Sequence, residues 1–112
     1  MSRPTPARRV AYETLRRVFE EGAWADRALR SAASRVGIEG RERAQAQALA
    51  YGAVQRRGSS DHFAALLADR RVAKIDPPLL AALRLGLFEL LWAESADHAA
   101  VDQAVSLAKG PG

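Results

Sequence analysis

The 112-residue sequence contains no cysteine, which excludes disulfides and thiolate chemistry. It has two histidines, His62 and His98, and these cannot complete a usual zinc shell unless several carboxylates join them. Their spacing does not match HExxH, and neither a glycine-rich phosphate loop nor a GxSxG motif occurs. We therefore expect no metal site and no catalytic residues in this chain.

Long apolar runs are also absent. None reaches the roughly 18 residues of a membrane span, because Arg84 and Glu89 interrupt the most apolar segment. The N-terminus MSRPTPARRV is charged and lacks the apolar core of a signal peptide. With the absence of cysteine, these features predict a cytoplasmic protein that has no membrane partner. The length and the 48% apolar content predict one soluble domain over residues 1–112.

Basic residues are concentrated in the first two thirds of the sequence. Residues 1–75 hold 15 of the 17 Lys and Arg and 8 of the 13 acids, whereas residues 76–112 hold 2 bases and 5 acids. Most of the bases are arginine, whose planar guanidinium suits phosphate better than an ammonium group does. This asymmetry indicates a polyanion that binds the N-terminal part, with a merely solvated basic surface as the alternative.

Helices are predicted throughout, because alanine and leucine dominate and strand-like alternation is absent. Thr5 and Pro6 are typical of a helix start, and Gly22 of a helix end. Gly58 is expected to end the third helix, and Ser59 or Ser60 to begin the fourth. The helices after the first are expected over about 24–36, 41–57, 59–69, 77–92 and 97–110.

The helix expected over residues 77–92 is apolar on two faces. One face consists of leucines, and the other contains Leu85, Phe88 and Trp92. A helix that is apolar nearly all round belongs in the centre of a bundle, so we predict that its neighbours enclose it.

Eight basic residues are the candidates for contact with a phosphate backbone. They stand at the start of the first helix and near the ends of the third and fourth: Arg3, Arg8, Arg9, Arg56, Arg57, Arg70, Arg71 and Lys74. The Arg8–Arg9 and Arg56–Arg57 pairs are expected to bind RNA or another polyanion, because neither pair is neutralised locally. The alternative is that arginines at helix ends satisfy loose carbonyls and the helix dipole.

Other residues of the same types are expected to have structural roles. Arg16 and Arg17 each have a glutamate four residues away, and such pairs stabilise an exposed helix face. Arg9 has Glu13 at the same spacing, and this pair is the structural alternative to RNA contact by Arg9. The aromatics that could stack on bases lie on or beside apolar stripes, so core packing is expected for Tyr12, Trp24 and Tyr51.

Four stretches resemble the NusB family, the all-helical RNA-binding fold of bacterial transcription antitermination. The same fold forms the N-terminal domain of RsmB-type small-subunit rRNA cytosine-C5 methyltransferases. The stretches are PARRVAYETLRRV at 6–18, YGAVQRRGSSDHF at 51–63, IDPPLLAALRLGLFELL at 75–91 and HAAVDQAVSLAKG at 98–110. The middle two, followed by DHAAV, are closer to the methyltransferase branch. Family members commonly carry Asn-Glu where this chain has Asp102-Gln103.

The resemblance implies an all-α bundle of roughly five to six helices and a non-catalytic, RNA-binding domain, with rRNA as the expected RNA. In NusB the arginine-rich start of the first helix contacts RNA, and the matching positions are Arg8 and Arg9, with Arg3 just upstream. In the methyltransferases a separate domain binds S-adenosylmethionine, and a cysteine adds to C6 of the pyrimidine. A chain without cysteine cannot methylate by itself, so that cofactor is expected only for a downstream domain.

Two other functions stay open. The first is a free-standing antitermination factor, since NusB proteins pair with the ribosomal protein NusE. The second is a helical lid of a larger enzyme, without a ligand of its own.

Family members continue after the final glycine turn with one more helix, whereas this sequence ends at Gly112. We therefore expect that last helix to be missing and the chain to be an N-terminal fragment. Val101, Val105 and parts of the Leu85–Phe88–Trp92 face are then predicted to lie incompletely covered. An exposed apolar face of this kind favours a homodimer or a domain swap.

Overall fold

The computed structural model describes residues 3–93 and 103–108, and within these ranges every regular element is a helix. The order is α1 (Pro6–Glu21), α2 (Ala25–Val36), α3 (Gly40–Gln55), α4 (Arg57–Ala68), the 3-10 turn η1 (Val72–Lys74) and α5 (Pro77–Leu91). Residues 103–108 form one more short helical segment. The predicted all-α fold is confirmed.

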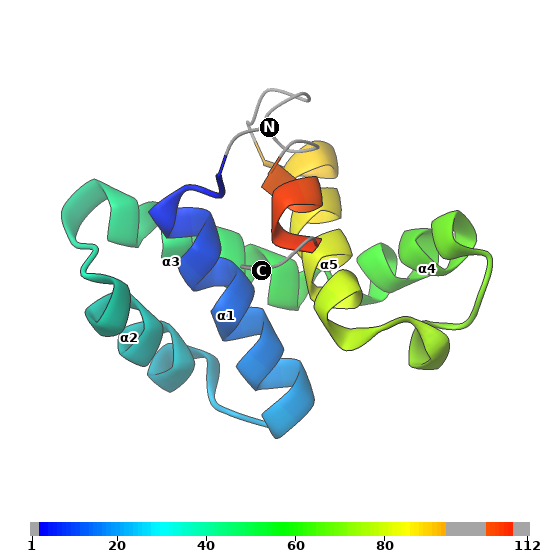
Figure 1. The fold of residues 1–112 in the computed structure, drawn as a ribbon, viewed down its shortest axis with the longest axis horizontal. Helices are drawn as coiled ribbons and strands as arrows, with labels where there is room; N and C mark the ends of the chain where they lie inside the picture. The colour runs from blue at the N-terminus through cyan, green and yellow to red at the C-terminus, as the bar shows by residue number, and fades with distance from the viewer. Residues whose placement is uncertain (1–2, 94–102, 109–112) are drawn as a thin grey trace.

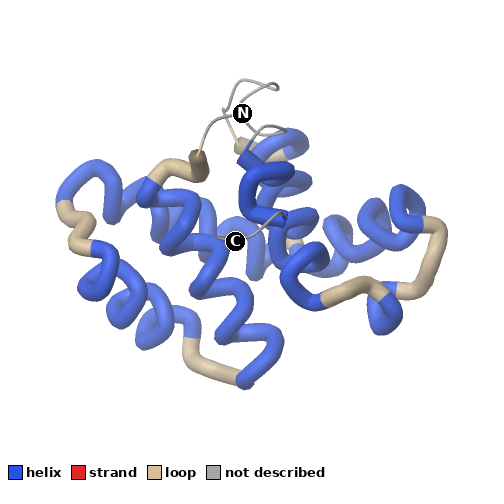
Figure 2. The backbone as a smooth tube through the Cα atoms, viewed as in Figure 1, coloured by secondary structure: helices blue, strands red, loops and turns tan. Residues whose placement is uncertain are grey.

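Helix α1 is central to one half of the molecule and α5 to the other (Figure 1). Helix α1 packs against α2, α3 and α5, while α5 also packs against α3 and α4. The short helix at 103–108 lies between the start of α1 and α5 in Figure 1, and its Leu107 enters the core beside Leu15 and Leu85. The loops that join α1 through α5 are short (Figure 2). No helix in the described residues has the length and apolar character needed to cross a membrane.

The ends of α1 are those predicted from the sequence. The Thr5 hydroxyl accepts a hydrogen bond from the backbone N–H of Arg8 at 3.3 Å, which satisfies one free donor of the first turn. Pro6 begins the helix, where the lack of an N–H costs nothing. Gly22 follows the last turn in the left-handed conformation, at φ +71°, which glycine adopts without strain.

The predicted boundary between the third and fourth helices is wrong. Helix α3 ends at Gln55 and α4 begins at Arg57, so only Arg56 separates them, and Gly58 lies inside the first turn of α4. The Arg56 N–H donates to the Gly52 carbonyl, and the Ser60 N–H donates to the Arg56 carbonyl, both at 3.0 Å. Because these bonds carry the hydrogen-bond pattern through the junction, no separate cap is needed.

Enclosure of α5 is confirmed for its inner face. Leu80, Ala81, Ala82, Leu85 and Leu87 are buried. The prediction is wrong for one further set of leucines, which are exposed at the two ends of the helix: Leu79, Leu90 and Leu91. The neighbouring helices therefore cover the inner face of α5 and leave leucines exposed near both of its ends.

The predicted gap in the C-terminal coverage is only partly present. Val105 is exposed as expected, and Phe88 and Trp92 are half-buried, whereas Leu85 is fully buried. The incompletely covered part of this face is therefore Phe88 and Trp92, because Leu107 and its neighbours in the core cover Leu85. Val101 and most of the helix expected over 97–110 lie outside the described residues. The homodimer or domain swap stays a prediction.

A close approach between helices occurs at Gly52 of α3. A Cβ placed on Gly52 would overlap the ring of Phe88 from α5. The missing side chain lets the tip of the ring approach the α3 backbone directly, and the same ring stacks with Trp92 at 6.4 Å between centroids. Gly52 therefore fixes how closely α3 and α5 can pack.

Candidate nucleic-acid interface

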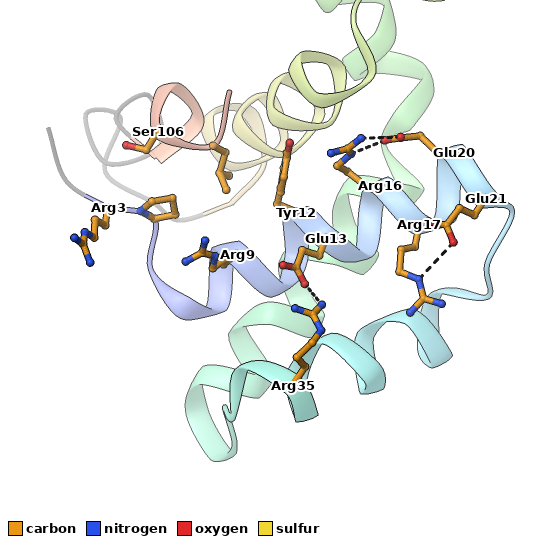
Figure 3. Close-up of a pocket in the computed structure, with 12 residues that line it drawn as sticks. Arg3, Arg9, Tyr12, Glu13, Arg16, Arg17, Glu20, Glu21, Arg35 and Ser106 are labelled. Atoms are coloured by element: carbon orange, nitrogen blue, oxygen red, sulfur yellow. Dashed lines mark hydrogen bonds and ion pairs between the residues drawn. The ribbon is translucent and has the colours of Figure 1, made fainter. Parts of the chain in front are cut away.

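An open pocket of about 800 Å³ runs along the outer face of α1 (Figure 3). Its walls come from the segment before α1, from α1 itself, from α2 and from the 103–108 helix. Five arginines and three glutamates line it, the arginines being Arg3, Arg9, Arg16, Arg17 and Arg35. The pocket is therefore strongly charged, and its net sign depends on which arginines are neutralised by those glutamates.

Two arginines in the middle of α1 are paired within the helix. Arg16 donates through two nitrogens to the Glu20 carboxylate, at 2.7 and 2.9 Å, as the sequence spacing predicts. This bond lowers the pKa of Glu20 below its ordinary value and raises the pKa of Arg16. Arg17 pairs with Glu21 at 3.8 Å. Both arginines thus have a local carboxylate that competes with any phosphate.

A third arginine of the pocket comes from α2. Arg35 donates to Glu13, and the contact raises the pKa of Arg35. Glu13 is four residues from both Arg9 and Arg17, so either could have been its partner. In the structure the guanidinium of Arg35 binds it. Arg35 is not among the residues predicted from the sequence, because its partner is 22 residues away on another helix.

Arg3 and Arg9 differ from the other arginines of the pocket. Both are exposed, and within residues 3–93 and 103–108 no acidic side chain forms an ion pair with either guanidinium. Figure 3 shows both side chains at the end of the pocket that the start of α1 forms. Two guanidinium groups without a carboxylate partner leave this end of the pocket positive.

Arg8 does not belong to this surface, and the prediction that it is available to bind a polyanion is wrong. Only 8% of Arg8 and 1% of Glu89, on α5, are exposed. Nε and Nη2 of Arg8 donate to the Glu89 carboxylate at 2.7–3.0 Å. The pair joins the first turn of α1 to α5, so the Arg8 guanidinium is engaged inside the protein.

The chain segment before α1 is fixed by Gln103. Its side-chain oxygen accepts a hydrogen bond from the Thr5 N–H at 2.7 Å, and its side-chain nitrogen donates to the Arg3 carbonyl at 3.2 Å. Gln103 itself is 6% exposed. In the sequence, the Asp102-Gln103 dipeptide is notable only as a departure from the NusB family, and Asp102 lies outside the described residues. No sequence signal could have identified partners about 100 residues away.

The Arg56–Arg57 pair lies on a second part of the surface. The Arg56 guanidinium lies over the Trp92 ring at 5.2 Å from its centroid, and that of Arg57 lies over the Phe19 ring at 5.4 Å. Both arginines are exposed, and neither forms an ion pair within the part of the chain that the structure describes. The aromatic rings restrict their motion and leave the donors accessible.

A smaller pocket of about 260 Å³ lies between these two regions. It is lined by Arg57 and Phe19, by Arg84, and by the same Arg16 and Glu20 that line the larger pocket. Arg84 is held by Asp61, at 2.7 and 2.9 Å, and lies 4.3 Å from the Phe19 centroid. The Arg16–Glu20 pair therefore separates two neighbouring depressions on one surface.

The remaining candidates, Arg70, Arg71 and Lys74, are exposed around η1. None of them lines either pocket. Val72 and Ala73, which stand between Arg71 and Lys74, do line the smaller one. The structure therefore places this group beside the second depression and away from Arg3 and Arg9.

No group of three or more potential metal ligands occurs in the described ranges, 3–93 and 103–108. His62 is exposed and packs edge-on against Phe63 at 5.6 Å between centroids.

Comparison with known proteins places this chain among relatives of two kinds. Residues 5–112 match the NusB family. Putative methyltransferases from two strains of Mycobacterium tuberculosis are 43% identical over 103 residues, which is 92% of this chain and 22% of each relative. The chain thus spans about a fifth of the length of these curated relatives.

Two solved structures have a similar fold. A chain in a crystal structure of a plectonemic RNA supercoil aligns with a TM-score of 0.84 and 22% identity, over 91% of this chain and 76% of that one. A chain in a crystal structure of the antitermination factors NusB and NusE with double-stranded RNA gives 0.82 and 22%, over 93% and 79%. At this identity the likeness establishes the fold.

Proposed function

This chain belongs to the NusB family, and from that premise we propose that it is a non-catalytic, RNA-binding domain of an rRNA cytosine-C5 methyltransferase. The observation that supports this most is the match to the putative methyltransferases, which covers 92% of this chain and 22% of theirs. A domain of this size would supply RNA affinity, while the rest of such a protein would bind S-adenosylmethionine and carry out the transfer. We place the protein in the cytoplasm, with small-subunit rRNA as its partner.

Arg3 and Arg9 are the central RNA contacts of this proposal. Their guanidinium groups are exposed and lack an ion-pair partner in the described residues, so phosphate contact there breaks no existing pair. Arg56 and Arg57 extend the contact beyond the Arg16–Glu20 pair, with Arg70, Arg71 and Lys74 at the outer edge. Arg8 is omitted because Glu89 binds it inside the protein.

The proposal is tested by fluorescence anisotropy with a labelled, structured fragment of small-subunit rRNA. The double substitution Arg3→Glu and Arg9→Glu is expected to weaken binding at least tenfold, because two phosphate contacts are replaced by repulsion. The matched control is Arg27→Glu with Arg30→Glu on α2, where both arginines are exposed and neither lines either of the two pockets described above. Equal losses in both variants would mean that only net charge matters, and the proposed site would be wrong.

A second candidate function is contact with a ribosomal protein of the NusE type. The observation that favours it is an apolar stripe on the outer face of α4, where three large side chains are exposed: Phe63, Leu66 and Leu67. One solved neighbour comes from a complex with NusE. With purified NusE, Leu66→Glu plus Leu67→Glu should abolish binding, whereas Gln45→Glu plus Gln47→Glu on α3 adds the same charge and should not. No binding by the unmodified chain would exclude this function.

A further inference from the structure

We propose that Gln103 is a positioning residue for RNA binding, which holds the Arg3 backbone so that the Arg3 side chain stays at the pocket. The inference rests on the proposed function, since it assigns the means by which one of the RNA contacts is aligned. It concerns a residue that touches the backbone on both sides of Pro4 and does not itself need to contact RNA.

The two hydrogen bonds of Gln103 require an amide. The Thr5 N–H needs an acceptor, which the side-chain oxygen supplies, and the Arg3 carbonyl needs a donor, which the side-chain nitrogen supplies. An ionised carboxylate only accepts, so it would keep the first bond and place a negative oxygen against the Arg3 carbonyl. Glutamine at this position therefore does what a glutamate of the same shape cannot.

The location of Gln103 makes these bonds effective. The side chain is 6% exposed, so water competes weakly for its amide. Leu107, one turn further along the same short helix, is buried in the core with Leu15 and Leu85. Gln103 is thus mounted on an element that the core holds, and it fixes a segment that precedes the first helix.

Holding the Arg3 backbone lowers the conformational entropy that Arg3 loses when it binds RNA. Arg3 is exposed and stands outside any helix, so without these bonds its backbone would sample many positions. A guanidinium that is held in place loses less freedom when it binds a phosphate. The backbone of Arg9, by contrast, is fixed by α1 itself, so its contribution does not depend on Gln103.

The first experiment is a double-substitution cycle on RNA affinity in the intact chain. Gln103→Leu is expected to weaken RNA binding about tenfold, because the Arg3 guanidinium is then no longer aligned with its phosphate. A tenfold loss is about the contribution of one hydrogen bond to a charged group. In the Arg3→Ala background the same change is expected to cost less than about twofold, whereas in the Arg9→Ala background the full loss should remain. A loss that persists without the Arg3 side chain would overturn the inference. Thermal unfolding of each variant reports any general loss of folding.

The second experiment uses pH as a readout that a packing role would not change. Gln103→Glu should bind RNA more weakly than the unmodified chain at pH 7 and should recover as the pH falls toward 5. A protonated carboxyl group carries both a donor and an acceptor, and burial beside a carbonyl raises the pKa of the introduced carboxyl group. For Gln103→Leu, the ratio of its RNA affinity to that of the unmodified chain should be constant across this pH range. A Gln103→Glu defect that does not change with pH would contradict the proposed bonds.

Amide exchange separates this inference from the proposed function. The Thr5 N–H should be protected in the unmodified chain and should exchange at least about tenfold faster in Gln103→Leu, whether or not RNA is bound. An unmodified chain that binds no RNA but protects Thr5 would refute the proposed function, and with it the RNA-binding role of Gln103, and would leave only the hydrogen bonds to the backbone in place. RNA binding with a Thr5 N–H that exchanges freely would refute the role of Gln103 alone.

Discussion

The buried ion pair between Arg8 and Glu89 gives the strongest stability prediction. Substituting Glu89→Gln keeps the shape of the side chain and removes its charge, so the Arg8 guanidinium stays buried without this counter-ion. Only 8% of Arg8 is exposed, so rescue by water is limited. Breaking such a pair lowers the free energy of unfolding by about 3–5 kcal/mol. This is a large part of the ~5–15 kcal/mol that is the total free energy of unfolding of a typical domain.

The assay is thermal unfolding followed by circular dichroism. At about 4 °C per kcal/mol, Glu89→Gln is expected to lower Tm by about 12–20 °C. The double replacement Arg8→Leu with Glu89→Leu removes both charges and should recover most of that loss, since an apolar pair leaves no charge to desolvate. A Tm change below about 4 °C for Glu89→Gln would refute the claim that the pair is buried and essential.

Two further predictions concern packing and pH. Gly52→Ala should cost about 1–3 kcal/mol in urea unfolding, because its methyl group overlaps the Phe88 ring, whereas Gly58→Ala, with nothing within 4 Å, should be neutral or stabilising. Equal losses of stability in the two variants would contradict the close approach of Phe88 to Gly52. The Arg16–Glu20 pair should add at most about 0.5 kcal/mol to the free energy of unfolding. This contribution is fully present above the pKa of glutamate in the unfolded chain, and it is lost as the pH falls through the lowered pKa of Glu20 in the folded chain. The stability difference between the unmodified chain and Arg16→Gln should therefore shrink steadily as the pH falls below the ordinary pKa of glutamate, about 4.3.

The sequence predicted features that depend on neighbouring residues. Thr5, Pro6 and Gly22 specify the ends of α1 through local hydrogen bonds and backbone conformation, and these predictions are confirmed. The junction of α3 and α4 was placed wrongly because Gly58 and two serines look like an end and a start. The actual junction at Arg56 depends on how two helices pack.

The candidate site was less accessible to sequence analysis. Arg8 and Arg9 are adjacent and of one type, yet one is buried and the other exposed. Arg8 lies three and seven residues before Ala11 and Leu15, so it shares their buried stripe, and this spacing was the one available signal. Its partner Glu89 is 81 residues away. Gln103 is equally distant from the segment it holds, so only the folded chain reveals either contact.

The central claim is that Arg3 and Arg9 neutralise phosphates, and the salt dependence of RNA affinity tests it most directly. The logarithm of the binding constant should fall linearly with the logarithm of salt concentration for the unmodified chain. Replacing both arginines with alanine should make that slope shallower by about 1.4–1.8, the value for two phosphates. A slope that stays the same in the double variant would contradict the account.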